Sequence, residues 1–422
     1  MRAAALLSAV AWAGASAQTI VPPERGAQWF SRGGPGVLKC QVRQLPPVLD
    51  FSFRFSAGYT VAVPLEQFQG AGHRWTIIVR VQSAGAAQPV YFVDRVRLQS
   101  IPRTRMYGEA GGGYLLGEGS YRAAFLLRDE QGRACRADWN IEARLGAHDR
   151  HVKLAIEPGA AEEISLRGTR PAGQPGDAPL GRLTVLLDAA PVSPRRSTIQ
   201  ASDAVTLLGA LSSLLRLAPA DSVRLVVFNL DEQKEIYRRD RFTPDQLESV
   251  RQAMFDLQLG VVDYQTLQHP EGRVELLAGL VNRELEAEDR SDAVVFLGPQ
   301  GRSADKRALE TGNRSAGAGK FYYVEYQRPP ALAAALGRGP GRNRTDRWEA
   351  LGDIPSETRL HQYGAENRLP DETALGAGTP SPEETPLHDT IEYLVAGLKG
   401  KTMVVRTPDE FAKAMEQIAR GK

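Results

Sequence analysis

The sequence predicts a multidomain protein in which an all-β sandwich is followed by an α/β domain. The 422-residue chain is longer than one hydrophobic core usually serves, so more than one domain is expected. Its first half contains short runs of alternating apolar and polar residues, which are typical of antiparallel strands. Its second half opens on the apolar run Arg182–Pro191 and then alternates strand-like and helix-like segments, a pattern that indicates a parallel sheet covered on both faces.

Residues 1–17 have the composition of a cleaved secretory signal peptide. Arg2 precedes an apolar run that ends near Trp12, and Ala15-Ser16-Ala17 has the small-x-small form of a cleavage site. We expect cleavage near Ala17/Gln18 and a secreted or periplasmic protein. The apolar run is too short to span a bilayer and no later stretch is long enough, so no membrane span is predicted.

Residues 30–147 are predicted to form the sandwich, which we assign to the immunoglobulin-like class. Short turn segments separate its strands, and Asp129–Gly132 predicts the turn of a hairpin. The glycine-rich run Gly108–Gly119 lacks the strand-then-helix context of a phosphate-binding loop. The predicted strands are Leu49–Phe55, Tyr59–Leu65, Arg74–Val81, Val90–Leu98 and Ser120–Leu127.

Cys40 and Cys135 are the only cysteines, and they lie near the two ends of the predicted sandwich. An even number of cysteines in an exported chain favours a disulfide over free buried thiols. We therefore expect a bond between Cys40 and Cys135 that links the first and last strands of the sandwich.

Residues 148–181 are predicted to be a linker with short strands. Two such strands are expected around Pro158–Gly159, before a segment rich in glycine and proline. His148, Asp149 and His151 have a spacing that could place two imidazoles on one metal ion. Because no further ligands lie nearby in the sequence, a solvated connector is the expected role of this cluster.

Helices and strands alternate from Arg182 onward. Thr243-Pro244-Asp245-Gln246 and Thr407-Pro408-Asp409-Glu410 each combine an N-cap, a proline at the first helical position and a reciprocal side chain at the third, so each predicts the start of a helix. Other predicted helices are Ser202–Leu217 and Val274–Glu286. Predicted strands are Val223–Leu230, Glu235–Phe242 at an edge, Asp292–Gly298 and Phe321–Tyr326.

The order of these elements resembles the von Willebrand factor A domain, especially the related domain of exported bacterial proteins. The resemblance rests on LTVLLDAAP, VRLVVFNL, DAVVFLG and KTMVVRTPDEFAKAMEQI, and it covers residues 182–326 and 387–420. It implies a Rossmann-like sheet wrapped by helices. Residues 327–386, rich in Gly, Pro, Arg and Glu, interrupt the pattern and are predicted to be a flexible insert.

The resemblance also implies a metal-ion-dependent adhesion site, but only its first ligand position, Asp188, keeps an oxygen side chain. Mg²⁺ needs several hard oxygen ligands, so we predict no bound metal and no cofactor. Asp188 is instead expected to accept hydrogen bonds from backbone N–H groups. The other ligand positions correspond to Ala190, Val192, Arg273 or Val274, and Gly298 or Pro299.

Two classes of function are consistent with the sequence. The first is an exported, non-enzymatic protein-interaction or adhesion-type protein, with Asp188, Pro191 and Ser193 as its candidate interaction edge. The alternative is a secreted hydrolase with dispersed catalytic residues. GxSxG, HExxH and P-loop motifs are missing, so no catalytic residue is assigned. The net charge of +2 gives no support to a nucleic-acid partner.

Overall fold

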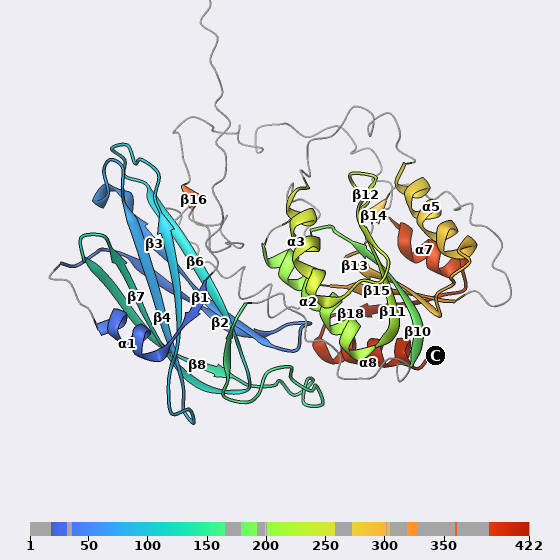
Figure 1. Ribbon diagram of the computed structural model, residues 1–422, viewed down its shortest axis with the longest axis horizontal. Helices are drawn as coiled ribbons and strands as arrows, with labels where there is room; N and C mark the ends of the chain where they lie inside the picture. The colour runs from blue at the N-terminus through green and yellow to red at the C-terminus, as the bar shows by residue number, and fades with distance from the viewer. Residues whose placement is uncertain are drawn as a thin grey trace, which may run out of the picture.

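The computed structural model describes residues 18–31, 36–164, 179–191, 199, 201–257, 272–300, 302–303, 319–327, 359–360 and 388–421. The predicted signal peptide and most of the predicted insert lie outside these residues, as do Val192 and Ser193. The remaining chain forms a sandwich of two antiparallel sheets and a six-stranded α/β sheet (Figure 1).

The sandwich pairs two sheets whose inner faces share one apolar core, with Trp75 fully buried between them. Strands on either side of residues 30–147 also belong to its sheets. The first sheet has the order β1 (Thr19–Val21), β5 (Val90–Arg97), β4 (Arg74–Ser83), β7 (Gly119–Asp129) and β8 (Ala134–Ala143). The second has the order β16 (Arg359–Leu360), β6 (Tyr107–Leu116), β3 (Phe55–Pro64) and β2 (Gln41–Leu49), and β9 (Ala161–Glu163) also pairs with β6.

A disulfide joins Cys40 and Cys135, the pairing expected from the sequence. Cys40 directly precedes β2 and Cys135 lies in β8, with their Cα atoms 6.2 Å apart. Because β2 and β8 are edge strands of different sheets, the bond closes one side of the sandwich.

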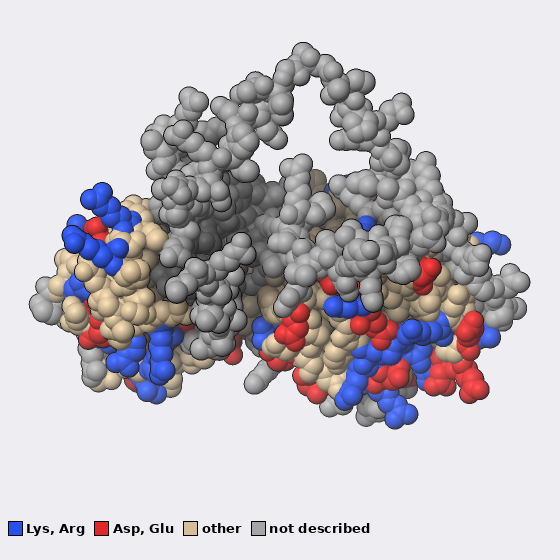
Figure 2. Space-filling model, turned by 90° about the horizontal axis from the view of Figure 1, so that it is seen from above, with Lys and Arg blue, Asp and Glu red and all other residues tan. Residues whose placement is uncertain are grey.

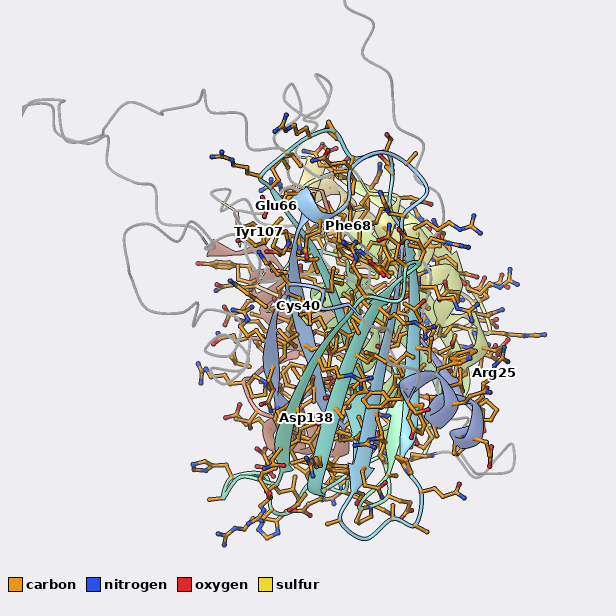
Figure 3. All side chains as sticks on the ribbon, turned by 90° about the vertical axis from the view of Figure 1, so that its left-hand side faces the viewer. Arg25, Cys40, Glu66, Phe68, Tyr107 and Asp138 are labelled. Carbon is orange, nitrogen blue, oxygen red and sulfur yellow. A yellow bond between two sulfur atoms is a disulfide. The ribbon has the colours of Figure 1, made fainter. Side chains whose placement is uncertain are left out.

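A short helix, α1 (Pro23–Ser31), covers part of the outer face of the first sheet; Figure 3 shows it at Arg25, beside the strands. Its Trp29 lies between the guanidinium groups of Arg25 and Arg95, 4.6 and 5.2 Å from the ring centroid. Neither α1 nor β1 is predicted by the sequence pattern, since both are short and precede the first long alternating run.

The predicted strand Leu49–Phe55 is wrong. β2 ends at Leu49, β3 begins at Phe55, and the residues between them form a tight turn. The alternation that suggested a strand is real, because Phe51 and Phe53 are each only 1% exposed. These two rings are buried against the α/β domain rather than between the sheets.

Two long strands of the sandwich escape sequence prediction for a physical reason. Pro46 and Pro47 lie inside β2, where the pairing with β3 shifts register, as prolines in strands require. β6 includes the glycine-rich run because its backbone approaches β3 closely: a Cβ atom on Gly58 would lie 2.3 Å from the carbonyl oxygen of Gly112. Of the two short strands expected in the linker, only β9 is present among the described residues.

The α/β sheet has the order β12 (Lys234–Arg239), β11 (Ala220–Asn229), β10 (Leu180–Asp188), β13 (Ala293–Gly298), β15 (Lys320–Tyr326) and β18 (Lys401–Val405). All neighbours are parallel except β12, which is the antiparallel edge strand that the sequence predicts. A two-residue ribbon pairs β14 (Arg302–Ser303) with β17 (His388–Asp389).

Helices cover both faces of this sheet. Leu183, Val185 and Leu187 of β10 face the side of α2 (Ala201–Leu217), α3 (Leu247–Phe255) and α8 (Pro408–Ala419). Leu186 faces α5 (Gly272–Glu286) and α7 (Thr390–Gly397). Both predicted caps are present: the turn η2 (Pro244–Gln246) leads into α3, and Thr407 caps α8 through its bond to the Glu410 N–H.

The turn between β2 and β3 joins the sandwich to the α/β domain. Its Phe51 ring stacks on Phe411 of α8 at 5.2 Å and meets the edge of Tyr326 at 6.0 Å. One continuous cluster of buried residues therefore runs through both parts. Figure 1 shows the end of β2 reaching from the sandwich toward α8.

The linker strengthens the same contact. The Ala155 N–H donates to the carbonyl of Phe53 at 2.9 Å, and Asp149 Oδ1 accepts the Asp409 N–H at the start of α8 at 3.3 Å. Asp149, one of the three residues considered for a metal site, thus supports the packing of α8.

Candidate functional site

The candidate site lies at the carboxyl edge of the α/β sheet, where β10 ends at Asp188. The strand order reverses at β10, and in open α/β sheets this switch point is where ligands bind. Asp188 is only 2% exposed and accepts the backbone N–H of Leu230, so it has the predicted role of a backbone acceptor. Gly298 of β13 permits this arrangement, because a Cβ atom there would lie 2.7 Å from the Cβ of Asp188.

Burial dominates the electrostatics of Asp188. Loss of solvent raises the pKa of its carboxyl well above the ordinary value, and the negative charges of Asp231 and Asp389 raise it further. The Arg273 guanidinium acts in the opposite direction but is the smaller influence. Asp188 Oδ1 has no hydrogen-bond partner within the described part of the chain. The site therefore favours the neutral carboxylic acid.

A second carboxyl, Asp389, lies close to this edge and caps α7. Its Oδ1 accepts the N–H groups of Ile391 and Glu392 at 2.9 and 3.2 Å. Burial raises the pKa of Asp389 to about 6, against the hydrogen bonds that stabilise its charged form. The sequence analysis missed this residue, although an Asp directly before an apolar helix, with Glu392 at the third helical position, is a capping signal.

Tyr323 connects Asp389 to the end of β13. Its hydroxyl lies 2.9 Å from the carbonyl oxygen of Pro299 and 3.0 Å from Asp389 Oδ2. A hydroxyl has one proton, so Tyr323 donates it either to the carbonyl of Pro299 or to the Asp389 carboxylate, and the bond to Asp389 stabilises the charged carboxyl against the effect of burial. A pKa of about 6 leaves Asp389 mostly ionised at pH 7 and protonated only in more acidic solution. Tyr326, from the same strand, has a buried hydroxyl with no described partner.

The exposed rim of the site is an ion pair. Arg273, at the start of α5, donates to Asp231 Oδ1 at 2.8 Å, and the two side chains are 34% and 59% exposed. The resemblance implies an oxygen ligand at Arg273 or Val274, and neither of these side chains offers an oxygen atom.

The residues at this edge do not fit a divalent cation. Ala190 and Gly298 offer no side-chain oxygen, and a guanidinium group cannot coordinate a metal. Across the described ranges, no group of three or more His, Cys, Asp or Glu residues is arranged to hold a metal ion. The absence of a bound metal stays a prediction that titration must test. Asp188 and Pro191 of the candidate interaction edge are buried, and Ser193 lies outside the described residues.

The surface of the α/β domain carries both signs of charge (Figure 2). Figure 2 shows acidic and basic residues interspersed over the α/β domain in that view. No helix in the described segments is both long enough and apolar enough to cross a membrane.

Comparisons with known proteins do not identify a family. No protein-family model matches the chain, and no curated protein matches it. A superoxide reductase (neelaredoxin) from Ignicoccus hospitalis is 13% identical over 25% of this chain and 80% of that one, with a TM-score of 0.19. A hypothetical protein from Pyrococcus horikoshii OT3 is 15% identical over 27% of this chain and 98% of that one, with a TM-score of 0.20.

A β-glucuronidase from Bacteroides uniformis is 10% identical over 68% of this chain and 36% of that one, with a TM-score of 0.19. Scores this low do not indicate a shared fold over the length of the chain. The functional argument therefore rests on the residues themselves.

Proposed function

We propose that this chain is an exported, non-enzymatic interaction protein that joins an immunoglobulin-like sandwich to a metal-free von Willebrand factor A-like domain. The strand order of the α/β sheet, with a single antiparallel edge strand and its switch point at Asp188, supports the second assignment. The hydroxyl of Tyr121 donates to the carbonyl of Gly117 at 2.9 Å, a corner contact that recurs in immunoglobulin-like domains and supports the first.

One observation carries the functional proposal: the Asp188 carboxyl at the switch point is buried, while the charged side chains of Asp231 and Arg273 at its rim are accessible to solvent. Asp188 is buried beside Gly298 and offers little to a substrate or metal ion. Asp231 is exposed and Arg273 is half-buried; the two side chains hold one another in place and are accessible to a protein partner. Fixed, complementary surface charges give specificity to protein association. The Cys40–Cys135 disulfide supports an oxidising compartment outside the cytoplasm.

The proposal is tested by swapping the charges of the rim. The double variant Asp231→Arg/Arg273→Asp keeps an ion pair but reverses the charge at each position. We expect the mature protein to capture a specific partner from the envelope fraction of its native cells, and the swapped variant to lose that partner. Glu416→Arg/Arg420→Glu is the matched control, because this pair at the end of α8 is also exposed and lies outside the rim.

Two results would contradict the proposal. The first is that the rim variant captures the partner as well as the control variant does, which would show that Asp231 and Arg273 are not part of the interface. The second is turnover of ester, peptide or phosphate substrates by the purified protein, since that activity would favour a hydrolase.

A further inference from the structure

Two arginines, one from each domain, lie at the contact between the sandwich and the α/β domain, close enough for the charge of one to act on the other. Arg54 ends the turn between β2 and β3, and Arg216 lies in the last turn of α2. Phe53, next to Arg54, holds them in place: its ring lies 5.4 Å below the Arg216 guanidinium and also packs on Phe411. The backbone of Phe53 has a φ of 60°, unusual for a bulky residue, so the surrounding contacts fix this turn.

Both arginines have buried N–H donors without acceptors. Arg54 Nε and Arg216 Nη2 have no hydrogen-bond partner within the described part of the chain. A buried donor left unpaired is destabilising, and more so on a charged group. Two such donors on neighbouring cations therefore indicate a missing acceptor.

The one acid in the turn does not supply this acceptor. Asp50 Oδ1 accepts the Ser52 N–H at 2.8 Å, and Oδ2 accepts the Ser56 hydroxyl at 2.6 Å. These bonds stabilise the turn itself and leave Asp50 only a long-range attraction to Arg54.

The two positive charges also oppose each other. Burial lowers the pKa of Arg216, and the nearby charge of Arg54 lowers it further. The Phe53 ring and the carboxyl end of α2 attract the Arg216 charge. Neither of them gives Arg216 Nη2 a hydrogen-bond acceptor. An anion between the two guanidinium groups would remove both the repulsion and the unpaired donors.

We propose that Arg54 and Arg216 form a binding site for one oxyanion group, a phosphate, sulfate or carboxylate, at the joint between the two domains. Such groups offer several acceptor oxygens and match the planar fork of guanidinium donors. The arginines come from different domains, so bound anion stabilises the docked arrangement over the separated one. This site does not include the Asp231–Arg273 rim, and the proposal does not depend on the interaction proposed for that rim.

The test is calorimetric titration of the full mature protein with inorganic phosphate, in chloride buffer at constant ionic strength. We expect saturable binding of one phosphate, and a loss of affinity of about tenfold or more in Arg54→Gln and in Arg216→Gln, as expected for a lost charge-assisted hydrogen bond. Arg80→Gln is the matched control, because Arg80 stacks on the Phe30 ring of α1, away from the joint.

A parallel titration with a short polyglutamate peptide distinguishes the source of the oxyanion. Phosphate binding alone assigns the site to a free anion, whereas peptide binding that is lost in the same two variants assigns it to acidic side chains of a protein. The proposal is overturned if neither ligand binds the wild type, or if binding persists unchanged in both joint variants. Circular dichroism of each variant separates loss of binding from loss of folding.

Discussion

The two ends of the α/β sheet bury polar groups in opposite ways. Near the amino end, Glu284 of α5 is 5% exposed and receives hydrogen bonds from Thr184 at 2.8 Å and from Arg224 at 3.0 and 3.1 Å. Arg224 in turn donates to Asp240 at 2.6 Å. At the carboxyl end, Asp188 and Tyr326 each keep a buried oxygen without a described partner.

The difference separates structure from function. A fully paired network stabilises the fold and leaves no polar atom for another molecule. The unpaired oxygens of Asp188 and Tyr326 lie at the carboxyl edge of the sheet, the edge at which ligands bind in open α/β sheets. The amino end thus supports the sheet, while the carboxyl end leaves buried polar atoms unpaired.

The largest predicted effect belongs to the paired end. Glu284→Ala removes the acceptor from Thr184 and Arg224, and we expect it to reduce the free energy of unfolding by about 3–5 kcal/mol. Urea denaturation measures this change. Glu248→Ala, which breaks an exposed pair with Arg251, should cost at most about 1 kcal/mol. Similar costs for both variants would show that the Glu284 network is not special.

The next effect is a pH dependence at the carboxyl end. The pKa of Asp389 rises from 3.8 to about 6 on folding, so the folded state holds the proton more tightly. The stability that this provides is present below pH 3.8 and is lost as the pH rises to about 6, in total about 2–3 kcal/mol. Asp389→Asn keeps a helix cap and should flatten this part of the stability profile. An unchanged slope between these pH values would contradict the assignment.

A smaller effect is expected at Asp188 itself. Asp188→Asn keeps the acceptor for Leu230 but removes the ionisable group, so we expect the variant to be more stable than the wild type at pH 7 by about 1 kcal/mol. Because the raised pKa of Asp188 weakens the wild type as pH increases, the gain should shrink toward acidic pH. Thermal melts at several pH values measure it. A less stable Asp188→Asn at pH 7 would indicate that the charged form is required.

Sequence patterns predicted the α/β half better than the sandwich because its strands are buried on both faces. The run through Leu183 and Leu187 identifies β10, and Thr407 marks the start of α8 to within a residue. Thr243 marks the short 3-10 turn η2, after which α3 begins at Leu247. In the sandwich, the prolines in β2 and the glycines in β6 break the alternating pattern, so the sequence does not predict these two strands. Phe51 and Phe53 have strand-like spacing but serve the joint between the domains, a tertiary role that no local pattern reveals.

The candidate site shows the same limit. Asp188 could be identified because it ends an apolar strand. The contributions of Tyr323 and Asp389 could not, since they come from strands and a helix start that are distant along the chain and meet only in the folded sheet. The unpaired donors of Arg54 and Arg216 likewise depend on how the two domains pack.

The smallest predicted effect is the response of the carboxyl end to divalent cations. Asp188 has Ala190, Gly298 and Arg273 around it in place of oxygen ligands, and its burial favours a neutral carboxyl, so neither charge nor coordination is available to replace the hydration shell of Mg²⁺. We expect no heat of binding when the mature protein is titrated with Mg²⁺ or Mn²⁺, and no change in melting temperature on adding a chelator. Asp188→Ala should respond in the same way as the wild type. Stoichiometric binding in the micromolar range that disappears in Asp188→Ala would show that the carboxyl end is a working metal site, and that the contrast between the two ends of the sheet has another origin.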